Sequence, residues 1–516
     1  MELATEQALL KENGRFYTPE ILADFLASKL ISAKEISVLD PAYGEGSLLL
    51  AAEKSFKKIN GNSSQLHLFG CDTKPLNGLL KHLPEANLRK LDFFDYPDEK
   101  KHDIILTNPP YVRHHLQDID NIEKYRMNHK GLNIVSVSAD LWVYFIIKSV
   151  SHLKKGGCIG AVLPWAFLQA DYAQPLRVWL SQTFGEIKLL ALRNKYFVNA
   201  DERVVLVWLR NYGEACKDVQ IGFAKEIMES VSYSKISLDE WKADRVLSNG
   251  TKEVNSIIAT CKDKFSFVEF QNYATIRIGV VTGANNYFIA SPEKAKALQI
   301  KKRNLLPILT NAKEFPEFIK NGPKNLNRLI FIKKKDYPLY RSFIGKGIAK
   351  KYHLREHSKG RTPWYQVKLG IVPDAFFPYR ITKIPYLIKN SSKIQSNNSV
   401  HRVYFNSLSD SEFKWIFVSM LSIYSQLSIE MHAKTYGRGI LKIEPKTLKK
   451  MLVIKKNDMV INSIYEKILL LLSNGEKLSA VKIATEFINS ELNIPAELFI
   501  RAEIAFNNLQ SMRLGK

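Results

Sequence analysis

The chain has 516 residues, of which 46% are hydrophobic and 11% aromatic, and it carries a formal net charge of +24. This length predicts two or three domains, and the apolar content excludes a disordered chain. The positive excess favours a polyanion as partner.

The cysteine pattern and the N-terminal segment limit the cellular setting. The cysteines are scattered, without the paired spacing of a zinc site or a disulfide framework, so we expect no bound metal. Residues 1–12 are polar and charged, unlike a secretory signal, and no apolar run reaches membrane-spanning length. We therefore expect a cytoplasmic protein without a membrane partner. The cysteines are Cys71, Cys158, Cys216 and Cys261.

Residues 14–26 predict a helix with a clear start. Thr18 is a good N-cap, Pro19 fits the first helical position, and Glu20 favours the helix dipole. An apolar pattern at 21–26 continues the helix.

Residues 38–49 predict the first strand, turn and helix of a nucleotide-binding sheet. The strand ends at Asp40, and two glycines in the turn let the backbone approach a ligand closely. The turn lacks the third glycine of the dinucleotide fingerprint and the Gly-Lys-Ser/Thr of a phosphate loop. An acid at this turn disfavours phosphate and favours a cation, such as a sulfonium carrying an amino-acid ammonium. The turn consists of Pro41, Ala42, Tyr43, Gly44, Glu45 and Gly46.

Two further strand ends carry carboxylates. The run 66–72 predicts a strand that ends at Asp72, and a carboxylate at this place can accept both ribose hydroxyls of an adenosine. At 91–95, Asp92 can accept from the adenine amino group, with Phe93 against the ring. A single aspartate at a strand end is often a helix cap, but this ordered set indicates an adenosine-containing ligand.

The run Asp103 to Tyr111, Asp-Ile-Ile-Leu-Thr-Asn-Pro-Pro-Tyr, is the most informative segment. Its apolar strand must stop at Pro109 and Pro110, which cannot donate to a sheet ladder and stiffen the following loop. At this edge, where ligands of open α/β sheets bind, Asn108 Oδ1 and the Pro109 carbonyl can accept both hydrogens of an exocyclic amine. Tyr111 can stack on the ring. Taken alone, these residues fit equally well a strand followed by an ordinary turn.

The motifs in this order resemble those of class I S-adenosylmethionine-dependent amino-methyltransferases. Within that class the chain is similar to the γ group of adenine DNA methyltransferases, the TaqI-like group. The motifs are Phe-Tyr-Thr-Pro at 16–19, Asp-Pro-Ala-x-Gly-x-Gly at 40–46, Cys-Asp at 71–72, Asp-Phe-Phe at 92–94 and Asn-Pro-Pro-Tyr at 108–111. Further matches lie at 138–145, 153–164, 193–197 and 204–209, and weaker patches reach about residue 455.

The resemblance implies an α/β fold, a doubly wound Rossmann-like methyltransferase sheet with a C-terminal α+β target recognition domain. We expect the catalytic domain at 1–212, the DNA target recognition domain at 213–457 and a helical C-terminal tail at 458–516. A polar turn at 211–214 sets the first of these boundaries.

The resemblance also implies the roles of the site residues. The catalytic residues are Asn108, Pro109, Pro110 and Tyr111, with Phe197 as a second stacking aromatic, although the adjacent Tyr196 is an alternative for that role. S-adenosylmethionine is the expected cofactor. Its contacts are expected from Tyr17, Thr18, Pro19, Asp40, Pro41, Ala42, Gly44, Gly46, Asp72, Asp92, Phe93 and Asn108.

The C-terminal half is rich in basic clusters near glycine, serine and aromatic residues. Phosphate clamping and base stacking use these residue types. A solvated loop would explain each cluster singly, but together they indicate a nucleic-acid groove. The clusters lie at 301–303, 333–335, 345–352 and 357–365. The tail shows amphipathic helices at 461–472, 479–490 and 496–509, which suit either a packing element or a partner-binding helix.

These observations predict a site-specific adenine-N6 DNA methyltransferase that acts as a monomer on double-stranded DNA and flips the target base out of the duplex. A restriction-modification or defence role is expected, with a cognate restriction endonuclease or specificity subunit as candidate partner. One alternative is an RNA-base or protein-glutamine methyltransferase, which rarely carries so large a basic half. Another is a DNA-binding specificity subunit with an inactive methyltransferase domain, which the intact Asp40, Asp72, Asp92 and Asn108 disfavour.

Overall fold

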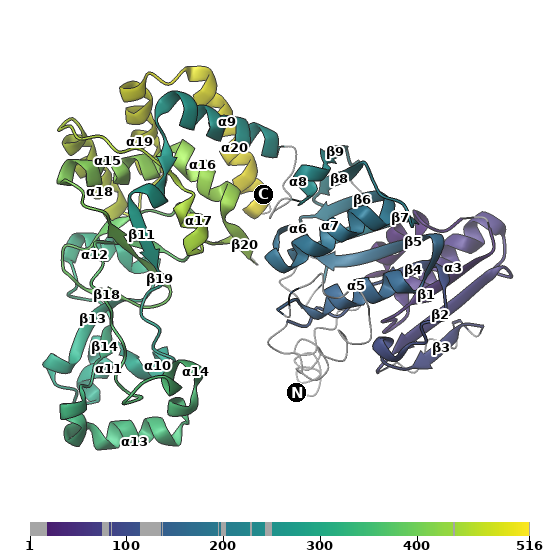
Figure 1. Ribbon diagram of the computed structural model, residues 1–516, viewed down its shortest axis with the longest axis horizontal. Coiled ribbons are helices and arrows are strands. Elements are labelled where there is room, and N and C mark those ends of the chain that lie inside the picture. Colours follow the sequence, from purple (N-terminus) through teal and green to yellow (C-terminus); the bar gives the residue numbers. More distant parts are fainter. Residues whose placement is uncertain are drawn as a thin grey trace. The chain divides into compact units, whose positions relative to one another are not determined.

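The chain divides into two compact units, one that ends at residue 249 and one that begins at residue 250 (Figure 1). The computed structural model describes residues 18–32, 34–74, 82–83, 85–113, 136, 138–194, 196–197, 203–227, 230–242, 250–436 and 439–514.

The first unit is built on a nine-stranded sheet with the order β3-β2-β1-β4-β5-β7-β6-β8-β9. Strands β1 to β5 pair in parallel, whereas β7 runs antiparallel between β5 and β6. The strand order reverses between β1 and β4, which is where open α/β sheets bind their ligands. The strands are β1 Ile36–Asp40, β2 Leu66–Asp72, β3 Asn87–Lys90, β4 His102–Thr107, β5 Leu153–Pro164, β6 Phe184–Leu192, β7 Val204–Tyr212, β8 Asp218–Ala224 and β9 Tyr233–Ser237.

Helices cover both faces of this sheet. Alternate side chains of a strand point to opposite faces, so Val38 packs with helices α2 and α3, whereas Leu39 packs with α5 and α7. Both faces are therefore apolar, as a doubly wound sheet requires. The helices are α2 Glu20–Ser28, α3 Ser47–Asn60, α5 Leu141–Ser151, α6 Ala166–Gln169, α7 Gln174–Thr183 and α8 Leu238–Lys242.

Helix α2 begins one residue later than predicted. Pro19 is the N-cap, with an extended ψ of 140°, and its carbonyl accepts hydrogen bonds from the N–H groups of Leu22 and Ala23. Because helical dihedrals start at Glu20, Thr18 precedes the cap, and the expectation that Thr18 caps the helix was wrong.

The second unit is an α+β structure with several small sheets, among them β11-β19-β15-β17 and β12-β14-β13-β18. Its strands are β10 Val268–Glu269, β11 Ala274–Arg277, β12 Ile289–Ala290, β13 Leu305–Leu309, β14 Arg328–Ile330, β15 Ala375–Pro378, β16 Arg380–Ile381, β17 Ile388–Lys389, β18 Gln395–Ser396, β19 Val400–Phe405, β20 Lys434–Tyr436, β21 Ile440–Lys442 and β22 Leu452–Val453. Its helices are α9 Gly250–Phe265, α10 Asn285–Phe288, α11 Pro292–Ala297, α12 Phe315–Asn321, α13 Arg341–Ala349, α14 Glu356–Lys359, α15 Asp410–Leu421, α16 Ile423–His432, α17 Pro445–Lys449, α18 Ile461–Ser473, α19 Lys477–Leu492 and α20 Ala496–Leu514.

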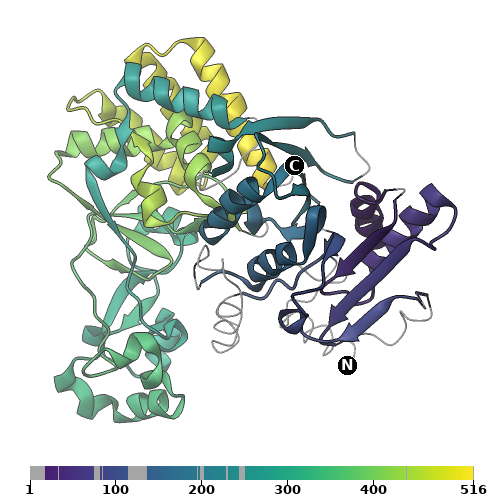
Figure 2. The same ribbon diagram turned by 45° about the vertical axis from the view of Figure 1, so that its right-hand side comes forward.

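The C-terminal helices pack into this second unit. Figure 2 shows the yellow helix α20 beside the teal helix α9, and α18 and α19 lie against α15. Arg513 on α20 forms a buried bidentate ion pair with Glu430 on α16, with Nη2 to Oε1 at 2.6 Å and Nε to Oε2 at 2.9 Å. One side of each of these C-terminal helices thus contributes to the core of this unit.

The boundary between the two units lies after residue 249, whereas the sequence predicted it at residue 212. Strands β8 and β9 follow that residue and extend the same sheet, through parallel pairing of β8 with β6. The compact unit accordingly ends after residue 249. In the described part of the chain, no helix combines the length and apolar character needed to cross a membrane.

Candidate active site

The carboxyl ends of β1, β2 and β4 bring the predicted acidic and amide residues to one edge of the sheet. Val38 and Leu39 pair with Ile104 and Ile105, so Asp40 and Asn108 leave neighbouring parallel strands at the switch point. Asp72 ends β2 on the other side of β1. The structure therefore brings together the residues that were predicted from separate motifs.

Asp40 is a buried carboxyl group at the start of the first turn, with 1% of its surface exposed. Burial raises its pKa from the ordinary value of 3.8 to about 8, with a further rise from the nearby Asp72 carboxylate. A hydrogen bond that Ala42 N donates to Asp40 Oδ1, at 3.1 Å, opposes this shift in the pKa. A positive charge beside this carboxyl group would favour its ionised form.

Asp72 connects the end of β2 to the first turn. Its Oδ2 accepts a hydrogen bond from Gly44 N at 3.1 Å, and its Oδ1 accepts one from Lys74 N at 2.7 Å. Gly44 and Gly46 have positive φ values of 53° and 80°, which side chains other than glycine disfavour. Asp72 thus helps to hold the first turn beside the end of β1.

Asp92 caps a short 3-10 turn, residues 93–95, by accepting a hydrogen bond from Phe94 N at 3.0 Å. Phe93 is only 2% exposed, and its ring packs in the core against Phe145 at a centroid distance of 5.4 Å. The aromatic ring expected beside the ligand therefore supports the Asp92 turn from inside the protein.

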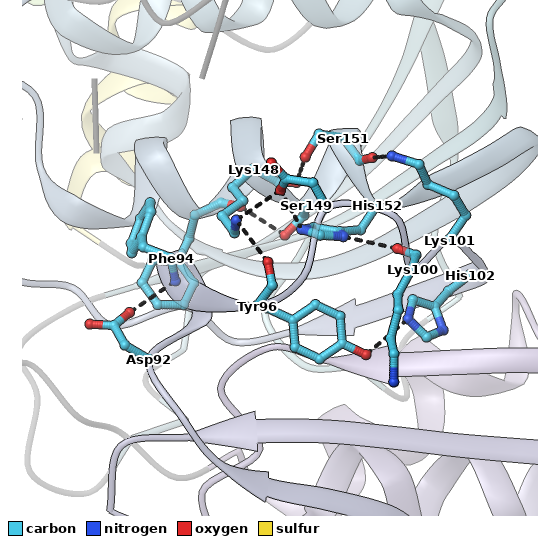
Figure 3. Close-up of polar contacts among 12 residues, drawn as sticks. Asp92, Phe94, Tyr96, Lys100, Lys101, His102, Lys148, Ser149, Ser151 and His152 are labelled. Carbon is cyan, nitrogen blue, oxygen red and sulfur yellow. Dashed lines mark hydrogen bonds and ion pairs between the residues drawn. The ribbon is translucent and has the colours of Figure 1, made fainter. Parts of the chain in front are cut away.

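A buried polar cluster beneath this turn escaped the sequence analysis (Figure 3). The ammonium of Lys148 is buried, donates to the Tyr96 carbonyl at 3.3 Å and lies 3.2 Å from Asp98 Oδ1. Burial lowers the pKa values of His102 and His152 to about 4, so both imidazoles are neutral at pH 7. The available signal in the sequence was a lysine, Lys148, directly after the apolar run 141–147.

The Asn-Pro-Pro-Tyr loop is anchored at its far end. Tyr111 donates its hydroxyl hydrogen to the Val162 carbonyl of β5 at 3.0 Å. The next carbonyl, that of Val112, accepts a hydrogen bond from Leu141 N at the start of α5, at 2.9 Å. Pro109 is buried and Asn108 is half-buried. The loop is therefore held between β5 and α5 with its amide group at the strand end.

Two aromatic rings meet above this loop. Tyr111 and Phe197 lie edge to face, with centroids 6.4 Å apart and an interplanar angle of 79°. Tyr196 is held elsewhere, because its hydroxyl accepts a hydrogen bond from Ile227 N at 2.7 Å. Of the two candidates for the second stacking residue, Phe197 is the one that faces Tyr111.

Three further predicted cofactor residues lie at or before the start of helix α2. Thr18 is buried and Pro19 half-buried at the start of α2, and Tyr17 lies outside the described residues.

Burial raises the pKa of Cys71, and its Sγ lies 3.6 Å from the Pro41 carbonyl. This thiol stays protonated at neutral pH and does not supply a nucleophile. Among the described residues no group of three or more His, Cys, Asp or Glu could hold a metal ion.

Two protein-family models together cover most of the chain. Residues 2–248 match the model for N-6 DNA Methylase, and residues 247–488 match the model for the C-terminal domain of the Type II methyltransferase M.Eco57I. The first half of this chain therefore belongs to the N-6 DNA Methylase family. Membership confirms the predicted enzyme class, a DNA methyltransferase of restriction-modification type, and the predicted fold.

Individual relatives of this methyltransferase agree with that assignment. The Type II methyltransferase M.AccI of Acinetobacter calcoaceticus is 23% identical over 90% of this chain and 91% of its own length. M.BanIII of Aneurinibacillus aneurinilyticus is 30% identical, over 37% of this chain and 38% of its own length.

Solved structures share the fold of this methyltransferase. The Type IIL restriction-modification enzyme MmeI, in complex with DNA, aligns with a TM-score of 0.58 and 14% identity over 99% of this chain and 76% of MmeI. The DrdV–DNA complex aligns with a TM-score of 0.51 and 12% identity, over 90% of this chain and 58% of that protein.

Proposed function

We propose that the protein is a site-specific DNA methyltransferase of the γ group, which transfers a methyl group from S-adenosylmethionine to the N6 amine of an adenine flipped out of duplex DNA. The observation that carries this proposal is the arrangement at the switch point. Asp40 ends β1 and Asn108 directly follows the neighbouring parallel strand β4, and the rings of Tyr111 and Phe197 lie edge to face.

The acidic residues at the strand ends fit the cofactor. S-adenosylmethionine, when bound, supplies an electrophilic methyl group on a sulfonium. The buried Asp40, whose pKa burial raises to about 8, suits the cationic amino-acid end of this molecule. The Asp72 and Asp92 carboxylates suit its ribose hydroxyls and adenine amine, because each has acceptor capacity beyond the backbone hydrogen bonds it already receives.

The Asn-Pro-Pro-Tyr loop would activate the acceptor amine. The lone pair of adenine N6 is conjugated with the ring and is a poor nucleophile. Asn108 Oδ1 and the Pro109 carbonyl can accept its two hydrogens, which favours a lone pair directed at the methyl group. Because the loop is held by Tyr111 and Val112, these acceptors are positioned in advance, and such positioning supplies much of the rate in enzymes.

The aromatic pair would hold the extruded base. Stacking on an aromatic side chain contributes about 1–3 kcal/mol per base. Since Tyr111 and Phe197 are edge to face, insertion of a base between them requires one ring to turn. The Tyr111 hydroxyl is hydrogen-bonded to β5, so we expect Phe197 to be the ring that turns.

The second unit would bind and select the DNA, as the net charge of +24 supports. The neighbours MmeI and DrdV are described as complexes with DNA. Lys350 and Lys351, at the end of α13, are exposed and suit phosphate contacts. We infer a monomer on double-stranded DNA in a restriction-modification system, with a cognate endonuclease or specificity subunit as partner.

The test is methyl transfer from labelled cofactor by the wild type and by Asn108→Ala. We expect the variant to retain cofactor binding in calorimetry and to lose transfer to plasmid DNA, while Asn62→Ala, an exposed turn residue of the same unit, stays active. Substantial transfer by Asn108→Ala would remove the mechanism. Wild-type transfer to total RNA or ribosomal protein in place of plasmid would identify the alternative substrate classes, and absence of cofactor binding would indicate an inactive specificity subunit.

A further inference from the structure

A tightly held strap, residues 278–283, follows strand β11 in the second unit. Val280 N donates to the Ser396 carbonyl at 2.7 Å, and Val280 forms a parallel bridge with Asn397. A Cβ added at Gly279 would lie 1.8 Å from the Asn397 carbonyl oxygen, and Gly283 has a φ of +79°. The strap therefore has one rigid backbone path, set by glycine at both positions.

Three arginines each donate to a different carbonyl of this strap. Arg402 Nε binds the Ile278 oxygen at 3.0 Å, Arg361 Nη2 binds the Val281 oxygen at 2.7 Å, and Arg355 Nη1 binds the Gly283 oxygen at 2.9 Å. Within the described part of the chain, none of these guanidinium groups has a carboxylate within 4.0 Å. Their three positive charges are consequently oriented by neutral carbonyls and are not neutralised by carboxylates.

These charges line two adjacent hollows on the strap. One hollow, of about 380 Å³, is lined by Arg355 together with hydroxyl, amide and imidazole groups, and the other, of about 370 Å³, by Arg361, Lys368 and Arg402. The hollows share Val281 and His357. Glu356 is the one carboxylate in either lining, against four cationic side chains.

Arg361 is the most informative of the four cations. Its side chain is 8% exposed, and its Nη1 has no hydrogen-bond partner among the described residues. A guanidinium has five donor hydrogens, and a buried donor without a partner is costly. Burial also lowers the pKa values of Arg361 and Arg402, which reflects the same desolvation of charge. An anion at this place would supply the missing acceptors and counter-charge.

We propose that the strap 278–283 with Arg355, Arg361, Lys368 and Arg402 binds consecutive phosphates of a DNA strand. Two joined hollows fit a repeating anion better than a single small one, and oxygen-rich phosphodiesters suit fixed guanidinium donors. Because the arginines are already held by the strap, little side-chain freedom is lost on binding. This site rests on the proposed DNA substrate and assigns part of its backbone contact to these residues.

The experiment compares the salt dependence of duplex binding by the wild type and by Arg355→Gln/Lys368→Gln, with fluorescence anisotropy from 50 to 200 mM NaCl. Each lost phosphate contact should reduce the slope of log K against log salt by about 0.9. For two contacts the wild-type affinity should therefore fall about 12-fold more than that of the variant over this range. The matched control is Lys467→Gln/Lys482→Gln, two exposed lysines on α18 and α19, which should keep the wild-type slope.

The outcomes separate this site from the proposed function. If the wild type methylates DNA and Arg355→Gln/Lys368→Gln keeps the wild-type slope, the proposed phosphate site is wrong and the proposed function stands. If the wild type neither binds nor methylates DNA, both fail. If Arg355→Gln/Lys368→Gln melts at a lower temperature than the wild type, its altered salt dependence could come from misfolding. The single variant Lys368→Gln then tests the phosphate site. This exposed side chain has no hydrogen-bond or ion-pair partner among the described residues, so its loss should leave folding intact and reduce the slope by about 0.9.

Discussion

Cofactor binding is expected to release a proton at neutral pH, because Asp40 is both buried and placed where a cation would bind. With a pKa of about 8, this carboxyl group is about nine-tenths protonated at pH 7 in the ligand-free protein. A cationic cofactor favours the carboxylate and so lowers the pKa of Asp40 on binding. The proton must then leave for the bulk solvent.

The size of the pH effect on cofactor affinity follows from the pKa of Asp40. Well below pH 8, each lower pH unit should weaken the apparent cofactor affinity about tenfold, which is 1.36 kcal/mol per unit. If the pKa of Asp40 in the complex falls to about 5 or lower, the affinity should be about 50-fold weaker at pH 6 than at pH 8. The affinity should become flat above about pH 9.

Calorimetry in two buffers with different ionisation enthalpies measures the released protons directly. At pH 7 we expect about 0.9 proton released per cofactor bound. Asp40→Asn, which cannot titrate, should bind more weakly and without this proton release. An affinity that is constant from pH 6 to 8, with no proton release by the wild type, would refute the role of Asp40.

The rise in the pKa of Asp40 on burial also predicts how the stability of the ligand-free protein depends on pH. The folded state keeps a proton on Asp40 that the unfolded chain loses above its ordinary pKa of 3.8. Folded molecules therefore bind more protons between about pH 4 and pH 8, and the contribution of this group to the free energy of unfolding falls as the pH rises through that window. Thermal melting with Asp40→Asn as the control measures this contribution.

Three further predictions concern named contacts. Asp72→Ala removes the proposed ribose acceptor together with the hydrogen bond from Gly44 N in the first turn, and should weaken cofactor binding by about 1–3 kcal/mol in calorimetry; unchanged affinity would show that Asp72 is not the acceptor. Phe197→Ala should weaken binding of DNA with 2-aminopurine at the target position and reduce its fluorescence change, whereas Tyr196→Phe keeps both; equal losses would contradict the choice of Phe197. Arg513→Met removes the cation of the buried ion pair with Glu430 and should lower the free energy of unfolding in urea by about 3–5 kcal/mol, and adding Glu430→Met should restore much of it. If the two substitutions lowered the free energy of unfolding additively, the side chains of Arg513 and Glu430 would not be coupled.

The sequence by itself determined the strand ends and their chemistry. An apolar run that meets two prolines has to end as a strand at that point, whatever the rest of the chain does. The same local logic placed Asp40 and Asp72 at the ends of parallel strands, and parallel strands present those ends at one edge. These features depend on neighbours in the chain, which is why the order of motifs was sufficient to predict them.

The tertiary structure alone decided which residues meet from a distance. The sequence predicts Phe93 beside a ligand, and only the fold shows that its ring is buried in the core, where Phe145 of a neighbouring helix packs against it. Strands β8 and β9, which follow residue 212, extend the first sheet because β8 pairs with β6. No local sequence pattern predicts this contact.

The ion pair of Arg513 with Glu430 spans 83 positions, and the hydrogen bond of Arg402 to the 278–283 strap spans 124. Periodicity and capping signals extend over a few turns at most, whereas such contacts depend on how whole elements pack. The strand ends that carry the candidate site could therefore be predicted from the sequence, whereas the residues that hold them in place, and the arginines on the strap, became visible only in the folded chain.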